Sequence, residues 1–293
     1  MKKQKFSVFG VTVGIFLGIY TISIVAMFLW AINVSLLTID TFDFDTLSLT
    51  KDWAFENYTY AYFKGFASDV ESGATIRPVY IEEMFLNSIL YAGGGALCQV
   101  AGTCLTAYLI ARYDNKFSRF MHSVIIVTMI LPIVGALPSQ IKVFDALQMR
   151  NTFVGAWFMK FSFTNTYYLI FYGAFKSMSW GYAEAAYIDG ANHFQIFFKI
   201  MLPLVSTLCG VTFIIFFITY WNDYQTPMLF LEQNPVLAFG LYDVFNGGKQ
   251  YAVGMTPVVQ ITCGVIVLIP LLILFMIFKN KLMGNLTEGG LKG

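Results

Sequence analysis

Few side chains in this sequence are spaced as a catalytic or metal-binding site would require. His122 and His193 lie far apart with no acidic or cysteine cluster beside them, so neither has the ligand set of a metal site. The stretch Gly247-Gly248-Lys249 lacks the upstream glycine spacing and the following hydroxyl residue of a phosphate-binding loop. We therefore predict no catalytic or metal-binding residue and no cofactor bound by this chain. The four cysteines, interpreted as small core residues, are Cys98, Cys104, Cys209 and Cys263.

Polar residues inside or beside long apolar stretches are a second group that could do chemistry. Polar groups at membrane depth tend to face protein or water, so such side chains are candidates for lining a solute path. Lys160 is instead expected to reach the outer membrane boundary or to pair within a helix bundle. The path candidates are Asn87, Asn222 and Asp223, with Gln99 and Asn165 as further members.

The most strongly patterned polar stretch is EAAYIDGANHFQIFFKIMLPL, residues 184–204. Residues 182–188 favour a helix with Glu184 near its start, where an acid suits the helix dipole. Gly190 then fits a sharp turn, and Pro203 fits the first turn of a later helix. The side chains that follow the i, i+3, i+4, i+7 spacing of one apolar helical face are Phe194, Phe197, Phe198 and Met201. This pattern predicts two short helices joined by a glycine corner, and on periodicity alone they could simply anchor a loop to the membrane surface.

Composition predicts that the chain is an all-α membrane protein, whose helices hold these residues in place. The chain is 57% hydrophobic and 12% charged with a mean hydropathy of +0.66, whereas soluble domains carry roughly 25% charged residues. About 20 mostly apolar residues cross a bilayer, which predicts six transmembrane helices in one domain, residues 1–293. The first is too long for a secretion-signal core and is expected to stay in place. The predicted spans are 9–36, 84–111, 120–141, 152–175, 200–222 and 254–278.

Lysine and arginine gather in alternate connections, which predicts the orientation. The N-terminus, the 112–119 loop and the tail 279–293 are basic, while the 40–83 connection carries nine acidic and three basic residues. Both termini and the 176–199 loop are therefore predicted to be cytoplasmic. The acidic 40–83 loop and the 223–249 loop are predicted to be extracellular.

Small residues and prolines modify two of the predicted spans. Gly93, Gly94, Gly95 and Gly102 in the second span allow close helix approach, and we interpret them as an intramolecular packing face. Pro132 and Pro138 should bend or break the third span, which is tolerated only against protein or a water-filled path.

The 184–204 stretch resembles the EAA loop of ABC-importer permeases. The residues that fall in register with that pattern are Glu184, Ala185, Ala186, Asp189, Gly190, Ala191, Ile200, Leu202, Pro203 and Leu204. Thr207 departs from it, because many members of the family have a second proline there. Weaker motifs in the same order, including Asn87-Ser88, Ala111-Arg112 and Trp221-Asn222-Asp223, resemble the carbohydrate branch and its smaller, maltose-type second permease.

The resemblance implies a coupling role for this loop. In such permeases the first EAA helix docks in a groove of a cytoplasmic ATPase, so Glu184 would face basic or amide groups, Ala185 and Ala186 would permit close approach, and Gly190 would make the corner. Asp189, Ala191 and Pro203 belong to the same motif. ATP-driven closure of two ATPases would then switch the helix bundle between inward- and outward-facing states.

The resemblance also implies partners and a location. It implies a second homologous permease, two cytoplasmic ATPase subunits that use ATP and Mg²⁺, and an extracellular solute-binding protein that meets the 223–249 loop. The tail residues Gly289, Gly290, Lys292 and Gly293 resemble a tail that reaches into the ATPase interface. We expect a non-catalytic permease subunit of an oligosaccharide importer in a bacterial cytoplasmic membrane.

Three other function classes can be compared with the sequence. An ABC permease for a non-sugar solute would share every motif above. A proton- or sodium-coupled transporter would need internal repeats and intramembrane acids, and neither is evident. A channel or membrane scaffold would leave the EAA register unexplained.

Overall fold

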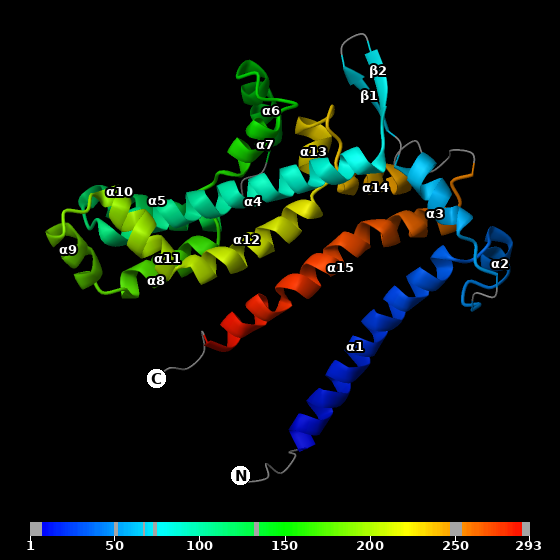
Figure 1. Ribbon diagram of the computed structural model, residues 1–293, viewed down its shortest axis with the longest axis horizontal. Helices are drawn as coiled ribbons and strands as arrows, with labels where there is room; N and C mark the ends of the chain where they lie inside the picture. Colours follow the sequence, from blue (N-terminus) through cyan, green and yellow to red (C-terminus); the bar gives the residue numbers. More distant parts are fainter. Residues whose placement is uncertain are drawn as a thin grey trace. The chain divides into compact units, whose positions relative to one another are not determined.

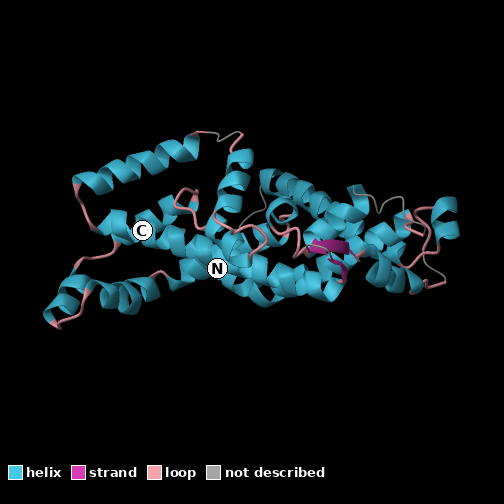
Figure 2. Cartoon of the chain, turned by 90° about the horizontal axis from the view of Figure 1, so that it is seen from above, coloured by secondary structure: helices cyan, strands magenta, loops and turns pink. Residues whose placement is uncertain are grey.

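The computed structural model describes residues 8–49, 52–66, 68–72, 75–131, 135–246 and 254–288. Helices dominate, and one short hairpin is the only strand pairing in those ranges (Figure 2). The chain divides into two compact units, Met1–Ala67 with Gly240–Pro270, and Ser68–Phe239 with Leu271–Gly293. The described ranges leave out Pro132, the stretch Gly247-Gly248-Lys249 and the tail residues Gly289, Gly290, Lys292 and Gly293.

The first unit is organised around the end of α1 (Val8–Ser35). Val34 and Leu37 pack with Val258 of α15 (Pro257–Glu288) in a small buried cluster. The Asn57 amide donates to the Ser35 carbonyl (3.0 Å) and to the Leu37 carbonyl (2.8 Å) and so satisfies the helix end. The other elements of this region are α2 (Ile39–Phe44), α3 (Glu56–Tyr60), the π-helix η1 (Ala61–Gly65) and the latter part of α14 (Leu237–Asn246).

The second unit is built on one long helix, α4 (Ile81–Arg112). α12 (Ser206–Trp221), α8 (Tyr167–Ser177) and α7 (Phe153–Lys160) pack along it, and Figure 1 shows α12 running beside it. The antiparallel strands β1 (Ser68–Ser72) and β2 (Thr75–Val79) precede it, with Val70 opposite Arg77. The remaining elements are α5 (Lys116–Ile130), α6 (Leu137–Ala146), α9 (Gly181–Ile188), α10 (His193–Ile196), the π-helix η2 (Phe197–Met201), α11 (Leu202–Leu204) and α13 (Gln225–Phe230).

The helices that could cross a membrane only partly match the six predicted spans. In the described residues two helices, α1 and α4, are long and apolar enough, and the pair His193–Leu204 with Ser206–Trp221, bent by 74°, makes a third if it is one span. The predicted third span is not one continuous helix. One helix ends at Ile130 and the next begins at Leu137, so the break lies in the region where prolines were expected to cause it. The six-span count is therefore not confirmed.

The predicted fourth span is also two short helices, because polar groups hold the chain between them. α7 ends at Lys160 and α8 begins at Tyr167. The Asn165 amide donates to Thr103 Oγ1 of α4 (2.6 Å), and its oxygen accepts from the Tyr167 backbone N–H (3.0 Å). The Gln99 amide donates to the Ser162 carbonyl (3.1 Å). These bonds satisfy backbone that has left the helix, as irregular structure within an apolar region requires.

The glycines of α4 form the predicted intramolecular packing face. A Cβ atom at Gly94 would lie 2.1 Å from the Trp157 ring, and one at Gly102 would lie 3.3 Å from the Ser162 carbonyl oxygen. The Trp157 indole N–H also donates to the Leu90 carbonyl (2.9 Å), so the ring lies against the helix backbone. The absence of a side chain at Gly94 is therefore what lets α7 approach α4.

Replacing Gly94 by alanine should destabilise the protein, whereas the same change at Gly93 should not. The added methyl at Gly94 would overlap the Trp157 ring, and overpacking typically costs about 1–3 kcal/mol. A Cβ at Gly93 would meet only Phe217, at 4.0 Å, and alanine is a better helix former than glycine by about 1 kcal/mol. The thermal unfolding midpoint of each detergent-purified variant checks this, and equal midpoints for the two variants would contradict it.

Candidate functional site

The predicted helix, glycine corner and second helix are present in residues 181–201, which we call the corner segment. α9 ends in a Schellman arrangement, in which Gly190 N–H donates to Tyr187 O (3.0 Å) and Ala191 N–H to Ala186 O (2.9 Å). Gly190 has a φ of +81°, which disfavours any residue with a Cβ atom. Asn192 then caps α10 in a reciprocal capping box with Gln195. The corner is therefore a defined turn with its backbone groups satisfied.

The first helix of the corner segment presents a distinct outward face. Glu184, Ala185 and Asp189 are exposed, and Ile188 is 87% exposed. Ala183 and Ala186 are buried inside the unit, at 0% and 8% exposure. Ala186 therefore packs within the chain, whereas Ala185 is open, and the docking role of both alanines stays a prediction.

The second helix does not have the single apolar face that was predicted. Phe197 and Met201 are buried, at 5% and 0% exposure, whereas Phe194 and Phe198 are 77% and 56% exposed. The reason is the π-helical turn η2, whose wider i→i+5 bonding shifts the angle between successive side chains. Pro203 lies in the short α11, at the bend before α12. Phe194 and Phe198 are therefore two exposed aromatic side chains of the corner segment, in addition to the exposed Ile188.

The start of the corner segment is held against the end of α4. Arg112 Nη1 donates to the Met178 carbonyl (3.0 Å), and its guanidinium carbon lies 5.4 Å from the centre of the Trp180 ring. Arg112 was noted in the sequence only as part of a weak motif, Ala111-Arg112. Its contacts give it the role of fixing the approach to α9.

A second cluster of polar groups is buried near the other end of α4. Lys160 Nζ lies 2.9 Å from Asp223 Oδ2, and the two side chains are 15% and 18% exposed. The Tyr91 hydroxyl donates to the same carboxylate oxygen (2.6 Å), and the Thr226 backbone N–H donates to Asp223 Oδ1 (3.0 Å). Lys160 Nζ also donates to Thr226 Oγ1 (3.1 Å). The carboxylate is thus neutralised and hydrogen bonded, as a charge removed from water must be.

The structure brings together only some of the predicted path residues. Asp223 and Gln99 are linked through Tyr220. The Asp223 backbone N–H donates to the Tyr220 carbonyl (3.2 Å), and the Tyr220 hydroxyl donates to Gln99 Oε1 (3.1 Å). Asn222 is exposed and its amide donates to the Ile218 carbonyl of its own helix (2.8 Å). Lys160 pairs within the bundle, which was one of its two expected roles. Its partner Asp223 was predicted only as a path candidate, and the pairing was missed because the two residues are 63 positions apart in the sequence.

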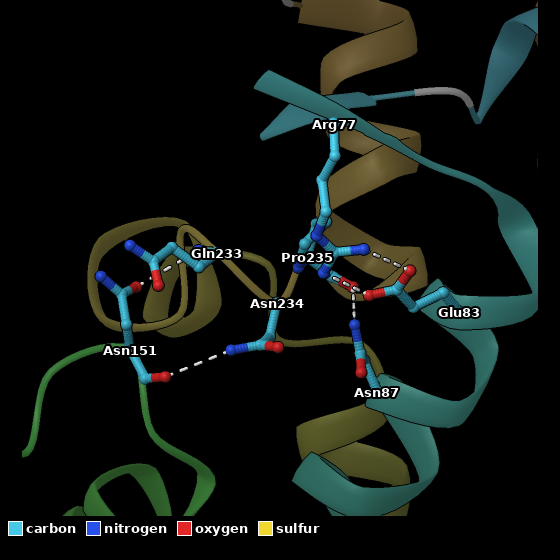
Figure 3. Close-up of polar contacts among 7 residues, drawn as sticks. All are labelled: Arg77, Glu83, Asn87, Asn151, Gln233, Asn234 and Pro235. Atoms are coloured by element: carbon cyan, nitrogen blue, oxygen red, sulfur yellow. Dashed lines mark hydrogen bonds and ion pairs between the residues drawn. The ribbon is translucent and has the colours of Figure 1, made fainter. Parts of the chain in front are cut away.

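Asn87 has a structural contact rather than an open surface. Its amide donates to the Pro235 carbonyl (3.0 Å), and the residue is 6% exposed (Figure 3). Nearby, Arg77 forms a two-bonded ion pair with Glu83 (2.7 and 2.8 Å), which holds the pKa of Glu83 below its usual range. The Asn87 amide thus links α4 to the chain at Pro235, and its path role stays a prediction.

The connection before α7 is joined to the connection after α13, which sequence analysis did not predict. The Asn151 N–H donates to the Phe230 carbonyl (2.7 Å), and the Asn234 amide donates to the Asn151 carbonyl (3.2 Å; Figure 3). Arg150 Nη2 meets Glu232 Oε1 at 2.5 Å. Asn151 has a φ of +59°, which asparagine tolerates better than most residues. Opposite charges at residues 150 and 232 were the only available signal, and nothing in the sequence pairs them.

Breaking the Lys160–Asp223 pair on one side should cost more stability than removing both charges. Lys160→Met or Asp223→Asn alone leaves one charge poorly compensated, which typically costs about 3–5 kcal/mol. We expect the double variant to recover most of that loss, because no unpaired charge remains. Thermal unfolding in detergent of the parent, the two single variants and the double variant gives a double-mutant cycle. Additive losses in the double variant would show that the two charges act independently.

Together, these features define a helical membrane protein. Its corner segment consists of two short helices joined by a glycine turn and packs against the end of α4. Residues 103–282 match the family of binding-protein-dependent transport system inner membrane components. The chain belongs to this family, whose members are transport subunits rather than enzymes.

Individual relatives agree with this assignment. The chain is 28% identical to the melibiose/raffinose/stachyose import permease protein MelC of Bacillus subtilis over 71% of this chain and 75% of that one. It is 24% identical to the diacetylchitobiose uptake system permease protein NgcG of Streptomyces coelicolor over 92% and 85%. The fold matches a chain of a bacterial ABC transporter involved in the import of alginate, with a TM-score of 0.75, 19% identity and coverage of 96% and 98%.

Proposed function

We propose that this chain is a permease subunit of an ATP-driven oligosaccharide importer, and that its corner segment is the coupling element that docks on a cytoplasmic ATPase. Membership of the family supports the transport role, and the positive-inside pattern of the loops favours a cytoplasmic position for the corner segment. The partner ATPases would bind and use ATP and Mg²⁺, and this chain would bind neither.

The observation that carries the coupling proposal is the exposed apolar surface on a rigid corner. Ile188, Phe194 and Phe198 are more than half exposed, beside the exposed carboxylates of Glu184 and Asp189. Large exposed apolar side chains rimmed by polar groups are typical of protein interaction sites. The Schellman turn and the capping box hold this surface in one shape, so binding to it would cost little ordering entropy.

A rigid corner would let ATPase closure act on the membrane helices. A ligand changes a two-state equilibrium only through its different affinity for the two states. Moving a bundle from 1:99 to 99:1 in favour of the outward state needs about 5.5 kcal/mol. In the proposed mechanism this energy comes from ATP binding in the partner subunits and reaches the bundle through the corner segment.

The sugar class and the remaining partners rest on the relatives. The two relatives described above are named for raffinose-type sugars and diacetylchitobiose, which supports an oligosaccharide as solute. We propose a second, homologous permease and an extracellular binding protein that meets residues 223–249. Asp223 would contribute to the solute path only if its pair with Lys160 opens, whereas Asn222 is already exposed. The tail residues Gly289, Gly290, Lys292 and Gly293 remain proposed ATPase contacts.

Glu184→Lys and Gly190→Pro should each separate ATP hydrolysis from sugar uptake while leaving membrane insertion intact. Lysine would reverse a charge on the proposed docking face. Proline has φ near −65° and cannot adopt the φ of +81° at Gly190. Uptake per ATP hydrolysed is measured in proteoliposomes that contain the complex co-purified with the tagged chain, using melibiose, raffinose, stachyose and diacetylchitobiose.

Gly173→Ala is the matched control, because Gly173 lies in α8 with no neighbour near an added Cβ. It should preserve uptake. If the folded parent chain co-purifies with no ATPase, the importer proposal fails. If it does co-purify and both corner variants couple as the parent does, the coupling role of the corner segment fails.

A further inference from the structure

His193 joins the corner segment to α4 through a single ring nitrogen. Its Nδ1 atom lies 2.5 Å from the Tyr187 hydroxyl and 2.8 Å from the Tyr113 hydroxyl. Tyr187 belongs to α9, His193 is the first residue of α10, and Tyr113 is the C-cap of α4. One atom therefore connects both helices of the corner segment with the end of the longest helix in the unit.

The three rings also pack against each other. The His193 ring centre lies 5.3 Å from that of Tyr187 in an edge-on arrangement and 5.9 Å from that of Tyr113. Tyr187 lies 6.4 Å from Trp180, which itself covers Arg112. The hydrogen-bonded nitrogen is therefore set in an aromatic cluster, and edge-on ring pairs favour this fixed geometry.

The chemistry of the ring requires both phenols to share one bonding position. Nδ1 of a neutral imidazole is a donor or an acceptor, but not both at once. Burial raises the pKa of Tyr113 and of Tyr187, so both are neutral hydroxyls that can donate or accept. Removing the imidazole would leave the two hydroxyls without this common partner and would weaken the contact between α9 and α4 at this point.

We propose that His193 is the positioning residue that transmits movement of the corner segment to α4. This inference rests on the proposed coupling function. When the ATPase moves α9, the Tyr187–His193–Tyr113 connection would move the end of α4 with it. The backbone route from α9 to α4 is indirect, since 68 residues separate Tyr113 from Gly181 along the chain. The side-chain connection from Tyr187 to Tyr113 is much shorter, because it passes through the single ring of His193.

Substitutions at residue 193 can distinguish this role from simple packing. Asparagine places its amide close to the position of Nδ1, so His193→Asn should retain a partner for the hydroxyls. Glutamine places its amide near the position of Nε2 instead, so His193→Gln should not. His193→Leu fills the space without a polar atom. If the ring acted only as bulk, leucine and glutamine would serve better than asparagine.

The second histidine provides a matched control. His122 Nδ1 lies 2.8 Å from the Tyr168 hydroxyl, and its ring stacks on Tyr172 at 4.4 Å. The contact is chemically similar but joins α5 to α8 and does not touch the corner segment. His122→Leu should therefore reproduce the loss of a histidine–tyrosine bond without the loss of transmission.

The test is hydrogen–deuterium exchange on the complete complex that co-purifies with this chain, with and without ATP and vanadate. In the parent we expect trapping to change exchange both in residues 181–201 and at the end of α4, residues 105–113. In His193→Leu and His193→Gln the change should be confined to residues 181–201. Exchange at residues 105–113 without nucleotide should rise about fivefold to tenfold in these two variants, as loss of one or two hydrogen bonds predicts.

His193→Asn and His122→Leu should respond at residues 105–113 as the parent does. A response at residues 105–113 that persists in His193→Leu would overturn the proposal, as would failure of asparagine to outperform glutamine. If the parent itself shows no response in residues 181–201, the coupling function fails rather than the role of His193. The two failures are therefore distinguishable within one data set.

Discussion

The packing of the second unit depends on hydrogen bonds between α4 and polar side chains that are buried away from water. In the N-terminal half of α4, Tyr91 donates to Asp223, whose charge is balanced by Lys160. An unpaired charge there would be far more costly than the pair itself is favourable. Because the three residues come from α4, from the end of α7 and from the turn after α12, satisfying one carboxylate also fixes three helices. Gly94, which admits the Trp157 ring, makes this close arrangement sterically possible.

The same helix is held at its other end by aromatic and cationic contacts. Tyr91 and Tyr113 are 22 residues apart, which is about 33 Å along an α-helix at 1.5 Å per residue. α4 thus links a buried ion pair at one end with the corner segment at the other. A continuous hydrogen-bonded helix is stiff over that distance, so displacement at Tyr113 has a direct mechanical route to the ion pair. This makes α4 a stronger candidate for carrying movement than the broken helices around it.

Sequence reasoning reached the helical class and the corner segment because both depend on local signals. Gly190 could be assigned a turn from its residue type, and the EAA register marked the whole segment. The two-part fourth span and the pairing of Asp223 were missed, because each depends on a partner distant in sequence, Thr103 for Asn165 and Lys160 for Asp223. Hydropathy counts charges along the chain and does not show which of them meet. The π-helical turn at Phe197–Met201 was missed for a related reason, since periodicity assumes a regular helix.

The Lys160–Asp223 pair also bears on the choice between transport mechanisms. A buried acid is what an ion-coupled transporter would need, and Asp223 would satisfy that requirement if it were free to exchange a proton. It instead accepts from Tyr91 and Thr226 and meets a lysine at 2.9 Å, an environment that favours the ionised carboxylate. A carboxylate held in one ionisation state suits a structural pair better than a proton carrier. Under the proposed function, the energy for transport then enters elsewhere, through the exposed corner segment.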